Sequence, residues 1–226
     1  MKRRKIRSLS VSEIGMRCMG FSHGYGQVPD AGYTEEAIRE AFGYGCNFFD
    51  TAEGYGKELY YPGHNEEIVG RAVKGFRNEA VIATKLHIQP ETVEDCGSVY
   101  VAVRRHLERS LKNLQSDYVD LYYLHRINME VDYLEVAHAM GRLIQEGLVR
   151  EWGISAVDKA QLEAAHAVTP VGAVQNIYSM VERTSEKDVI PFCVKNRHKA
   201  QRKAKFYINK CRSASCMQSG WKRTPA

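Results

Sequence analysis

The chain has 226 residues, 44% of them hydrophobic, and a formal net charge of +5, which allows a substantial buried core in one or two domains. No apolar run approaches the ~18 residues that span a bilayer, and no apolar stretch of a secretory signal follows the basic N-terminus, so we expect a soluble, cytoplasmic protein without a membrane partner. The six cysteines lack the spacing of metal ligands, which predicts reduced thiols and no metal site.

The first predicted elements are a hairpin, a strand and a helix. Residues 3–14 alternate weakly between polar and apolar side chains, a pattern typical of a small hairpin. Residues 16–21 predict a first buried strand. Thr34 precedes a helical pattern at 35–42 that Gly43 closes, so we expect Thr34 to cap this helix.

Three later strand-like runs each end in one reactive side chain. The apolar run after Gly45 stops at Asp50, residues 80–84 stop at Lys85, and residues 118–124 stop at His125. Asp and Gly disfavour strands whereas Phe favours them, so each run indicates a buried strand that ends where a polar site begins. A β/α barrel builds its active site from strand ends in this way.

Strand and helix patterns alternate about six times along the chain. The remaining predicted helices cover 65–73, 98–114, 133–146, 158–168 and 186–194, and the remaining strands cover 149–155 and 173–178. The long crossovers predict parallel strands. Open doubly wound sheets share this alternation, but they carry a G-x-G-x-x-G phosphate loop that is absent here. We therefore predict an α/β fold of the (β/α)8 TIM-barrel type.

The predicted barrel is incomplete, because such a barrel needs eight strands and about 250 residues. Alternation stops after Asn196, which divides the chain into a partial barrel at 1–196 and a basic tail at 197–226. Ten Lys and Arg and no acidic residue lie from Lys195 onward, which leaves 22 basic against 27 acidic residues before it. We expect this tail to be disordered and foreign to the fold, the product of a truncation or frameshift. It carries no recognisable module for nucleic acid.

A tyrosine, a lysine and an aspartate in one pocket serve proton transfer. Tyr55 lies in a glycine-flanked loop five positions after Asp50. A free tyrosine has a pKa near ~10, and an adjacent ammonium stabilises its phenolate. Asp50 can hold Lys85 charged and oriented, while His125 can hydrogen-bond a carbonyl oxygen. Together these residues can protonate an alkoxide as it forms, which is general acid catalysis.

The motif G-x-N-F-F-D-T-A-x-x-Y-G at 45–56, the A-T-K strand end and the L-H strand end resemble the aldo-keto reductase family. The resemblance extends from about Arg3 to Asn196. It implies an oxidoreductase on a (β/α)8 barrel that reduces small aldehydes and ketones with NADPH. Matching of the motifs implies that Tyr55 is the general acid, that Lys85 and Asp50 tune it, and that His125 orients the carbonyl.

The resemblance also implies positions for the cofactor and the substrate. The carboxamide of the cofactor would contact Ser155 and Gln175, although Ala156 stands where the family usually has Asn. Tyr178 is a further candidate, with packing as its alternative role, and backbone at Met19 and Gly20 would line the cofactor cleft. The candidate substrate contacts are Phe21, Tyr25 and Tyr60.

Two alternatives to an active reductase stay open. Lys85 at a barrel strand end also suits a Schiff-base aldolase. The missing βα units, which carry much of the family's grip on the cofactor, would leave strand edges uncovered, and an inactive remnant of the enzyme is the second alternative. The sequence leaves the substrate and the oligomeric state open.

Overall fold

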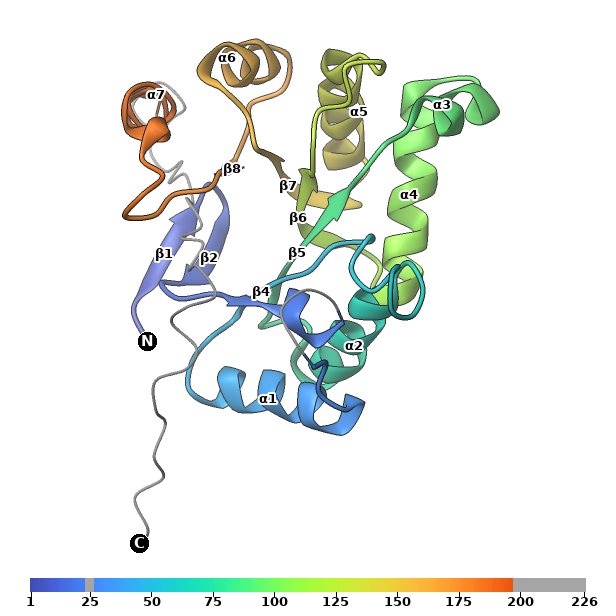
Figure 1. Ribbon diagram of the computed structural model, residues 1–226, viewed down its shortest axis with the longest axis vertical. Helices are drawn as coiled ribbons and strands as arrows, with labels where there is room; N and C mark the ends of the chain where they lie inside the picture. The colour runs from blue at the N-terminus through green and yellow to red at the C-terminus, as the bar shows by residue number, and fades with distance from the viewer. Residues whose placement is uncertain (23–26, 197–226) are drawn as a thin grey trace, which may run out of the picture.

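A curled, six-stranded parallel sheet forms the centre of the molecule in the computed structural model, which describes residues 1–22 and 27–196 (Figure 1). The strands follow one another around the sheet in the order β3-β4-β5-β6-β7-β8. Because spatial order equals sequence order, each helical crossover connects neighbouring strands, as in a singly wound barrel. The structure thus confirms a partial (β/α)8 barrel and excludes the doubly wound alternative for the described residues.

The secondary structure alternates as the sequence pattern predicts. The strands of the large sheet are β3 (Met16–Arg17), β4 (Phe48–Asp50), β5 (Val81–Leu86), β6 (Val119–Leu124), β7 (Val149–Ser155) and β8 (Ala173–Gln175). The α-helices are α1 (Ala31–Gly43), α2 (His64–Val73), α3 (Pro90–Cys96), α4 (Val99–Leu114), α5 (Tyr133–Gln145), α6 (Lys159–Val168) and α7 (Val189–Asn196). Short 3-10 helices are η1 (Cys18–Phe21), η2 (Lys74–Phe76) and η3 (Thr184–Glu186).

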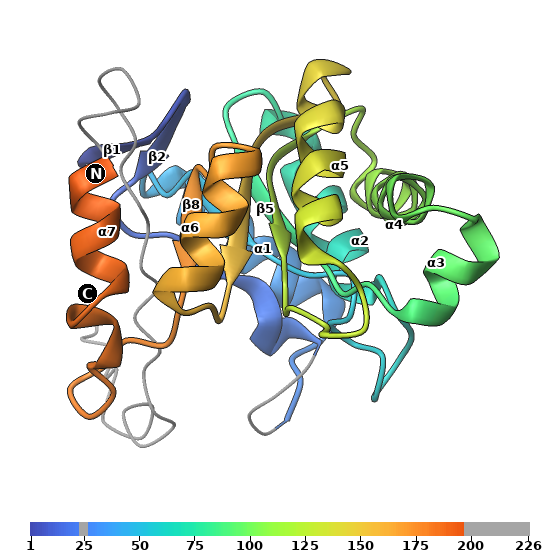
Figure 2. The ribbon, with the colours of Figure 1, turned by 90° about the horizontal axis from the view of Figure 1, so that it is seen from above.

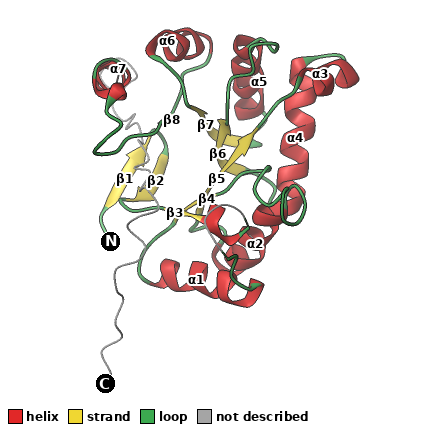
Figure 3. Cartoon of the chain, in the orientation of Figure 1, coloured by secondary structure: helices red, strands yellow, loops and turns green. Residues whose placement is uncertain are grey.

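The predicted N-terminal hairpin is present as β1 (Arg3–Ile6) and β2 (Leu9–Ser12), which pair antiparallel (Figure 3). Ile6, Leu9 and Val11 belong to an inner cluster with strand residues such as Phe48 and Leu121. A larger cluster fills the space between the sheet and the surrounding helices. The two clusters are the two layers that a barrel needs, one inside the curl and one under the helices.

The predicted strand at 16–21 is wrong beyond Arg17. Strand β3 pairs with β4 through Met16–Phe49 and Arg17–Asp50, and β4 ends at Asp50. The strand pairing stops at Arg17, and the Cys18 carbonyl oxygen instead accepts a hydrogen bond from Asn65 Nδ2 at 2.9 Å. The chain turns there into the 3-10 helix η1.

Two helix starts also differ from the prediction. Helix α1 begins at Ala31, because the Asp30 carboxylate accepts a hydrogen bond from the Tyr33 amide at 2.9 Å and caps it. Thr34 lies inside the first turn and donates to the Ala31 carbonyl oxygen. Helix α7 begins at Val189, because residues 184–186 form η3 first. The Ser98 and Asp158 side chains cap α4 and α6, each accepting a hydrogen bond from a backbone amide of the first turn.

Helices pack on the outer face of the open sheet, and a view from above shows α4, α5 and α6 along one side of it, with the β1–β2 hairpin on the other (Figure 2). None of the helices in the described ranges is long and apolar enough to cross a membrane. The prediction of a disordered tail at 197–226 lies outside the described residues, as does Tyr25.

Candidate active site

Three neighbouring strands bring their carboxyl-terminal ends together at one edge of the sheet. Asp50 ends β4, Lys85 is the second-last residue of β5, and His125 follows β6. Lys85 Nζ lies 2.6 Å from Asp50 Oδ1 and donates a second hydrogen bond to the Thr51 carbonyl oxygen at 2.5 Å. The Lys85 and Asp50 side chains are 0% and 4% exposed. A buried ammonium requires such partners, so this pair is fixed in place.

Tyr55 joins these residues from the loop after β4. Its ring centroid lies 5.0 Å from Lys85 Nζ and 5.9 Å from the His125 ring, which it meets edge-on. Tyr55 is buried against Met19 and Ala52. The structure thus brings all four predicted catalytic side chains into one cluster.

The loop that carries Tyr55 is shaped by local hydrogen bonds. The Thr51 amide donates to the Ala83 carbonyl oxygen at 2.8 Å, and the Tyr55 amide closes a turn onto Ala52 at 3.1 Å. Thr51 Oγ1 donates to Asn65 Oδ1 at 2.7 Å, which ties the loop to helix α2. Gly56 has a φ of +101°, a conformation that suits glycine and lets the chain turn away from the pocket.

The electrostatic surroundings keep His125 neutral. Burial, as the largest effect, and the nearby charge of Lys85 together lower the pKa of the imidazole from 6.5 to about 3, with smaller effects from Arg126, His87 and Arg17. A neutral imidazole carries one N–H and one lone pair. At neutral pH His125 can therefore donate one hydrogen bond without bringing another charge into the pocket.

The two predicted carboxamide contacts lie next to each other beside the cluster. Ser155 and Gln175 face one another across β7 and β8. Ser155 Oγ donates to the Gln175 carbonyl oxygen at 2.9 Å and accepts from the Arg126 guanidinium at 3.0 Å. The Gln175 amide nitrogen donates to Asp50 Oδ2 at 2.9 Å, so the strand end of β8 is bonded to the acidic member of the cluster.

The other predicted contacts are distributed more widely. Met19 packs on Tyr55, and a side chain added at Gly20 would meet no atom within 4 Å. Phe21 is half-buried at the end of η1, whereas Tyr60 is exposed and stacks on His64 with ring centroids 4.0 Å apart. The Tyr178 hydroxyl donates to the Glu186 carboxylate. Among the described residues, neither Tyr178 nor Tyr60 hydrogen-bonds to or stacks on the four clustered side chains.

Arg17 is a neighbour of the cluster that the sequence pattern did not indicate. It ends β3 opposite Asp50, and its Nη2 lies 3.5 Å from the Tyr55 hydroxyl and 3.2 Å from Met19 Sδ. Its place as the last residue of a strand was the signal that could have identified it, since the same rule selected Asp50. Arg17 therefore brings a second cation, after Lys85, to Tyr55.

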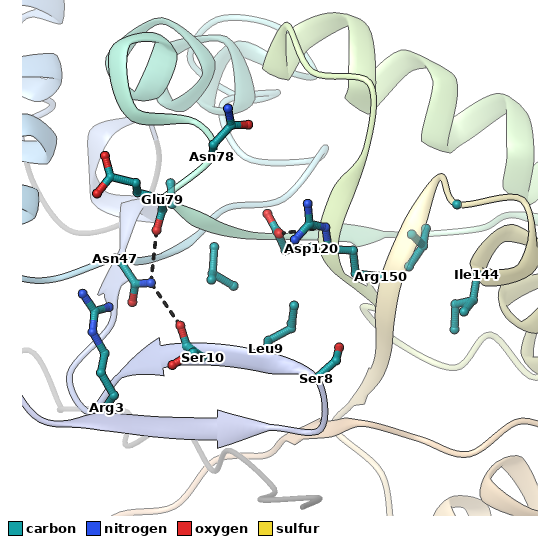
Figure 4. Close-up of a pocket in the computed structure, with 14 residues that line it drawn as sticks. Arg3, Ser8, Leu9, Ser10, Asn47, Asn78, Glu79, Asp120, Ile144 and Arg150 are labelled. Carbon is teal, nitrogen blue, oxygen red and sulfur yellow. Dashed lines mark hydrogen bonds and ion pairs between the residues drawn. The ribbon is translucent and has the colours of Figure 1, made fainter.

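A cavity of about 700 Å³ lies at the opposite end of the strands (Figure 4). It separates the hairpin from the amino-terminal ends of β5 and β7, and none of the predicted site residues lines it. Asn47 Nδ2 bridges its walls by donating to the Ser10 and Glu79 carbonyl oxygens at 3.1 and 3.2 Å. In barrels this end supports stability rather than catalysis.

Comparison with known proteins agrees with this fold. Residues 13–199 match the model of the aldo/keto reductase family. A probable aldo-keto reductase of Glycine max is 35% identical over 187 residues, which cover 81% of this chain and 52% of that protein. The chain thus spans about half the length of this curated relative.

Solved structures with the same fold include two aldo-keto reductases. A thermostable aldo-keto reductase crystallised with the inhibitor epalrestat has a TM-score of 0.74 at 32% identity, covering 87% of this chain and 70% of that one. An enzyme of Klebsiella pneumoniae crystallised with NADP and acetate has a TM-score of 0.69 at 30% identity, covering 82% and 61%. The matched motifs, the partial barrel and these relatives place the chain in the aldo/keto reductase family.

Proposed function

We propose that this site reduces an aldehyde or ketone to an alcohol with NADPH, with Tyr55 as the proton donor. The observation that carries the proposal is the position of Tyr55 between the buried Lys85–Asp50 pair and the neutral His125. Family membership supports the oxidoreductase class, and the Klebsiella pneumoniae relative was crystallised with NADP.

The side chains near the cluster suit a nicotinamide cofactor. A carboxamide needs both a hydrogen-bond donor and an acceptor, and Ser155 and Gln175 supply a hydroxyl and a second amide side by side at two strand ends. A Cβ at Gly20 would meet no atom within 4 Å, so the backbone there is open for a cofactor to approach. Ser155, Gln175 and the backbone of Met19 and Gly20 would hold the cofactor, which when bound supplies the hydride for the carbonyl carbon.

The residues of the chain then handle the carbonyl oxygen. The His125 N–H can donate a hydrogen bond to this oxygen and orient it toward Tyr55. As negative charge develops on the oxygen, the Tyr55 hydroxyl gives it a proton and becomes a phenolate. The ammonium of Lys85, held by Asp50, stabilises that phenolate, and its charge is effective because the pocket is buried.

The geometry disfavours the Schiff-base alternative. A lysine nucleophile must be neutral and must reach its substrate. Lys85 Nζ is instead fully buried, paired with Asp50 and hydrogen-bonded to the Thr51 carbonyl oxygen. Attack by Lys85 would require these contacts to break.

The test combines cofactor binding with turnover in the full chain. We expect NADPH fluorescence to shift on titration with the protein, and NADPH to be consumed when an aldehyde is added. Tyr55→Phe should lower kcat by about 10²- to 10⁴-fold without weakening NADPH binding. Tyr33→Phe is the matched control at an exposed tyrosine of α1 and should change kcat by less than twofold.

Two results would count against the proposal. A folded chain that does not bind NADPH would support the inactive remnant instead. A Tyr55→Phe variant that keeps wild-type turnover would show that another group donates the proton.

A further inference from the structure

Glu53 lies midway along the loop between Asp50 and Tyr55, and its side chain is anchored on two sides. Its Oε1 accepts a hydrogen bond from the His87 amide at 2.6 Å, and its Oε2 lies 2.7 Å from His106 Nδ1. His87 follows the strand that carries Lys85, whereas His106 belongs to helix α4. One carboxylate therefore joins the Tyr55 loop to both a strand exit and an outer helix.

The backbone of Glu53 is held as well. Its amide donates to the Lys85 carbonyl oxygen at 3.4 Å, and its carbonyl oxygen accepts from the Gly63 amide at 2.8 Å. With the two side-chain contacts, four hydrogen bonds act on one loop residue. This residue lies two positions before Tyr55, so its placement limits where the Tyr55 ring can lie relative to Lys85.

His106 is a buried polar residue on a mostly apolar helix face. It is 9% exposed and lies on the inner face of α4, next to Val103 and Leu107. His106 Nε2 has no hydrogen-bond partner among the described residues, so the bond to Glu53 is the ring's one hydrogen bond within that part of the chain. A carboxylate only accepts hydrogen bonds, so Nδ1 carries the hydrogen. Burial of a polar ring needs compensation, and Glu53 provides it.

Glu53 and His106 also line one cavity of about 480 Å³ between the loop and helices α2 and α4. Glu66 of α2 shares this cavity. It is fully buried and accepts hydrogen bonds from Thr84 Oγ1 at 2.5 Å and Asn113 Nδ2 at 2.9 Å. Burial is the largest effect on the pKa of Glu66 and raises it, although the hydrogen bonds from Thr84 and Asn113 act in the opposite direction. The wall behind the Tyr55 loop is therefore built of side-chain hydrogen bonds, in which displacement of one member affects its neighbours.

We propose that the Glu53–His106 pair is a positioning device that holds Tyr55 in reach of Lys85 and of the substrate oxygen. The inference rests on the proposed function, since it assigns the pair a role in the same proton transfer. A displacement of about 1 Å at a reacting group costs about 10²-fold in rate. Loss of the pair should therefore lower kcat, whereas KM and cofactor affinity depend on other residues.

The experiment uses three variants of the full chain at two histidines. His106→Leu removes the hydrogen bond and keeps an apolar side chain of similar size in the buried position. His106→Asn keeps a donor at the δ position. His138→Leu makes the same change as the first variant at an exposed histidine of α5. Each variant is measured for kcat, KM and NADPH affinity, and 3-fluorotyrosine at position 55 reports the surroundings of that ring by fluorine NMR.

We expect His106→Leu to lower kcat by about 10- to 100-fold with KM and NADPH affinity within threefold of wild type. His106→Asn should recover most of the lost rate, and His138→Leu should match wild type. The fluorine resonance at position 55 should shift or broaden in His106→Leu alone. An unchanged resonance and kcat in His106→Leu, or an equal loss in His106→Asn, would overturn the proposal.

The fluorine measurement needs no turnover, so it separates the two proposals. If the wild-type chain reduces no aldehyde, the proposed function fails, while the resonance still shows whether the pair positions Tyr55. If turnover is present but insensitive to position 106, the positioning proposal alone fails.

Discussion

Lys85 Nζ and Asp50 Oδ1 lie 2.6 Å apart in an ion pair from which solvent is excluded. The remaining contacts of both groups are internal, because Lys85 also donates to the Thr51 carbonyl oxygen and Asp50 Oδ2 accepts from Gln175. Removal of one partner from a buried ion pair leaves the other charge without compensation. This destabilises the fold far more than replacement of both partners by apolar side chains. The pair therefore links the stability of the partial barrel to its candidate chemistry.

Lys85→Met should destabilise the chain by about 3–5 kcal/mol, since Asp50 is left buried and unpaired. Urea denaturation followed by circular dichroism measures the change. Lys57→Met, at an exposed lysine of the Tyr55 loop, is the control and should change stability by less than about 0.5 kcal/mol. The double variant Lys85→Met/Asp50→Asn should lose less than the sum of its single variants, and strict additivity would contradict coupling of the pair.

His125 should stay neutral from pH 8 down to pH 5. Burial and the charge of Lys85 lower its folded pKa to about 3, against 6.5 for a free histidine. A group with a lowered folded pKa binds fewer protons when folded, so stability is lost as pH falls below 6.5. The loss is on the order of 2 kcal/mol between pH 7 and pH 5.

NMR of the histidine rings tests the protonation of His125 directly, and His125→Gln identifies its resonance. Its resonances should not move between pH 8 and pH 5. Lowered pKa values of His64 and His166, caused mainly by burial, add to the acid destabilisation in the same direction. A titration of His125 near pH 6.5 would show that the pocket is more hydrated than the structure indicates.

The strand ends were predictable from sequence because one rule places them. Apolar β-forming runs that stop at an ionisable residue put Asp50, Lys85 and His125 at one edge of a parallel sheet, and these side chains do lie there. Their catalytic roles stay predictions. The start of α6 was equally predictable, because Asp158 is a typical N-cap residue directly before the helical pattern.

Features that depend on distant partners could not be predicted in this way. His106 breaks an apolar helix face, and only its partner Glu53, 53 residues earlier, explains why it is buried. The turn at Cys18 depends on Asn65, 47 residues later. Arg17 was missed because the strand predicted at 16–21 put it in the interior of a strand, whereas β3 ends at Arg17. A sequence pattern reports local periodicity, whereas these contacts join residues that are far apart in the chain.

Arg17→Met should lower kcat by about tenfold, because Tyr55 would lose a charged hydrogen-bond donor that favours its phenolate. Methionine keeps the length and packing of the side chain. Steady-state kinetics with NADPH and an aldehyde measure the change, and Arg39→Met, at an exposed arginine of α1, is the control. A normal kcat in Arg17→Met would show that the 3.5 Å contact does not act on the proton transfer.

Gly70→Ala tests the contact between α2 and α4 that supports the Tyr55 loop. A Cβ at Gly70 would lie 2.6 Å from the Leu114 carbonyl oxygen, so the helices must move apart. Alanine favours a helix over glycine by about 1 kcal/mol, whereas overpacking costs about 1–3 kcal/mol. Because the obstacle is backbone, we expect the clash to prevail and the variant to lose about 1–2 kcal/mol in urea denaturation.

The matched control for Gly70→Ala is Gly75→Ala, at an exposed glycine where a Cβ meets nothing within 4 Å. Gly75→Ala should unfold within about 0.5 kcal/mol of wild type. Displacement of α2 in Gly70→Ala should also reach Asn65, which hydrogen-bonds Thr51 at the base of the Tyr55 loop. We therefore expect kcat to fall along with stability, and a variant with wild-type stability would show that α2 and α4 pack less closely than 2.6 Å implies.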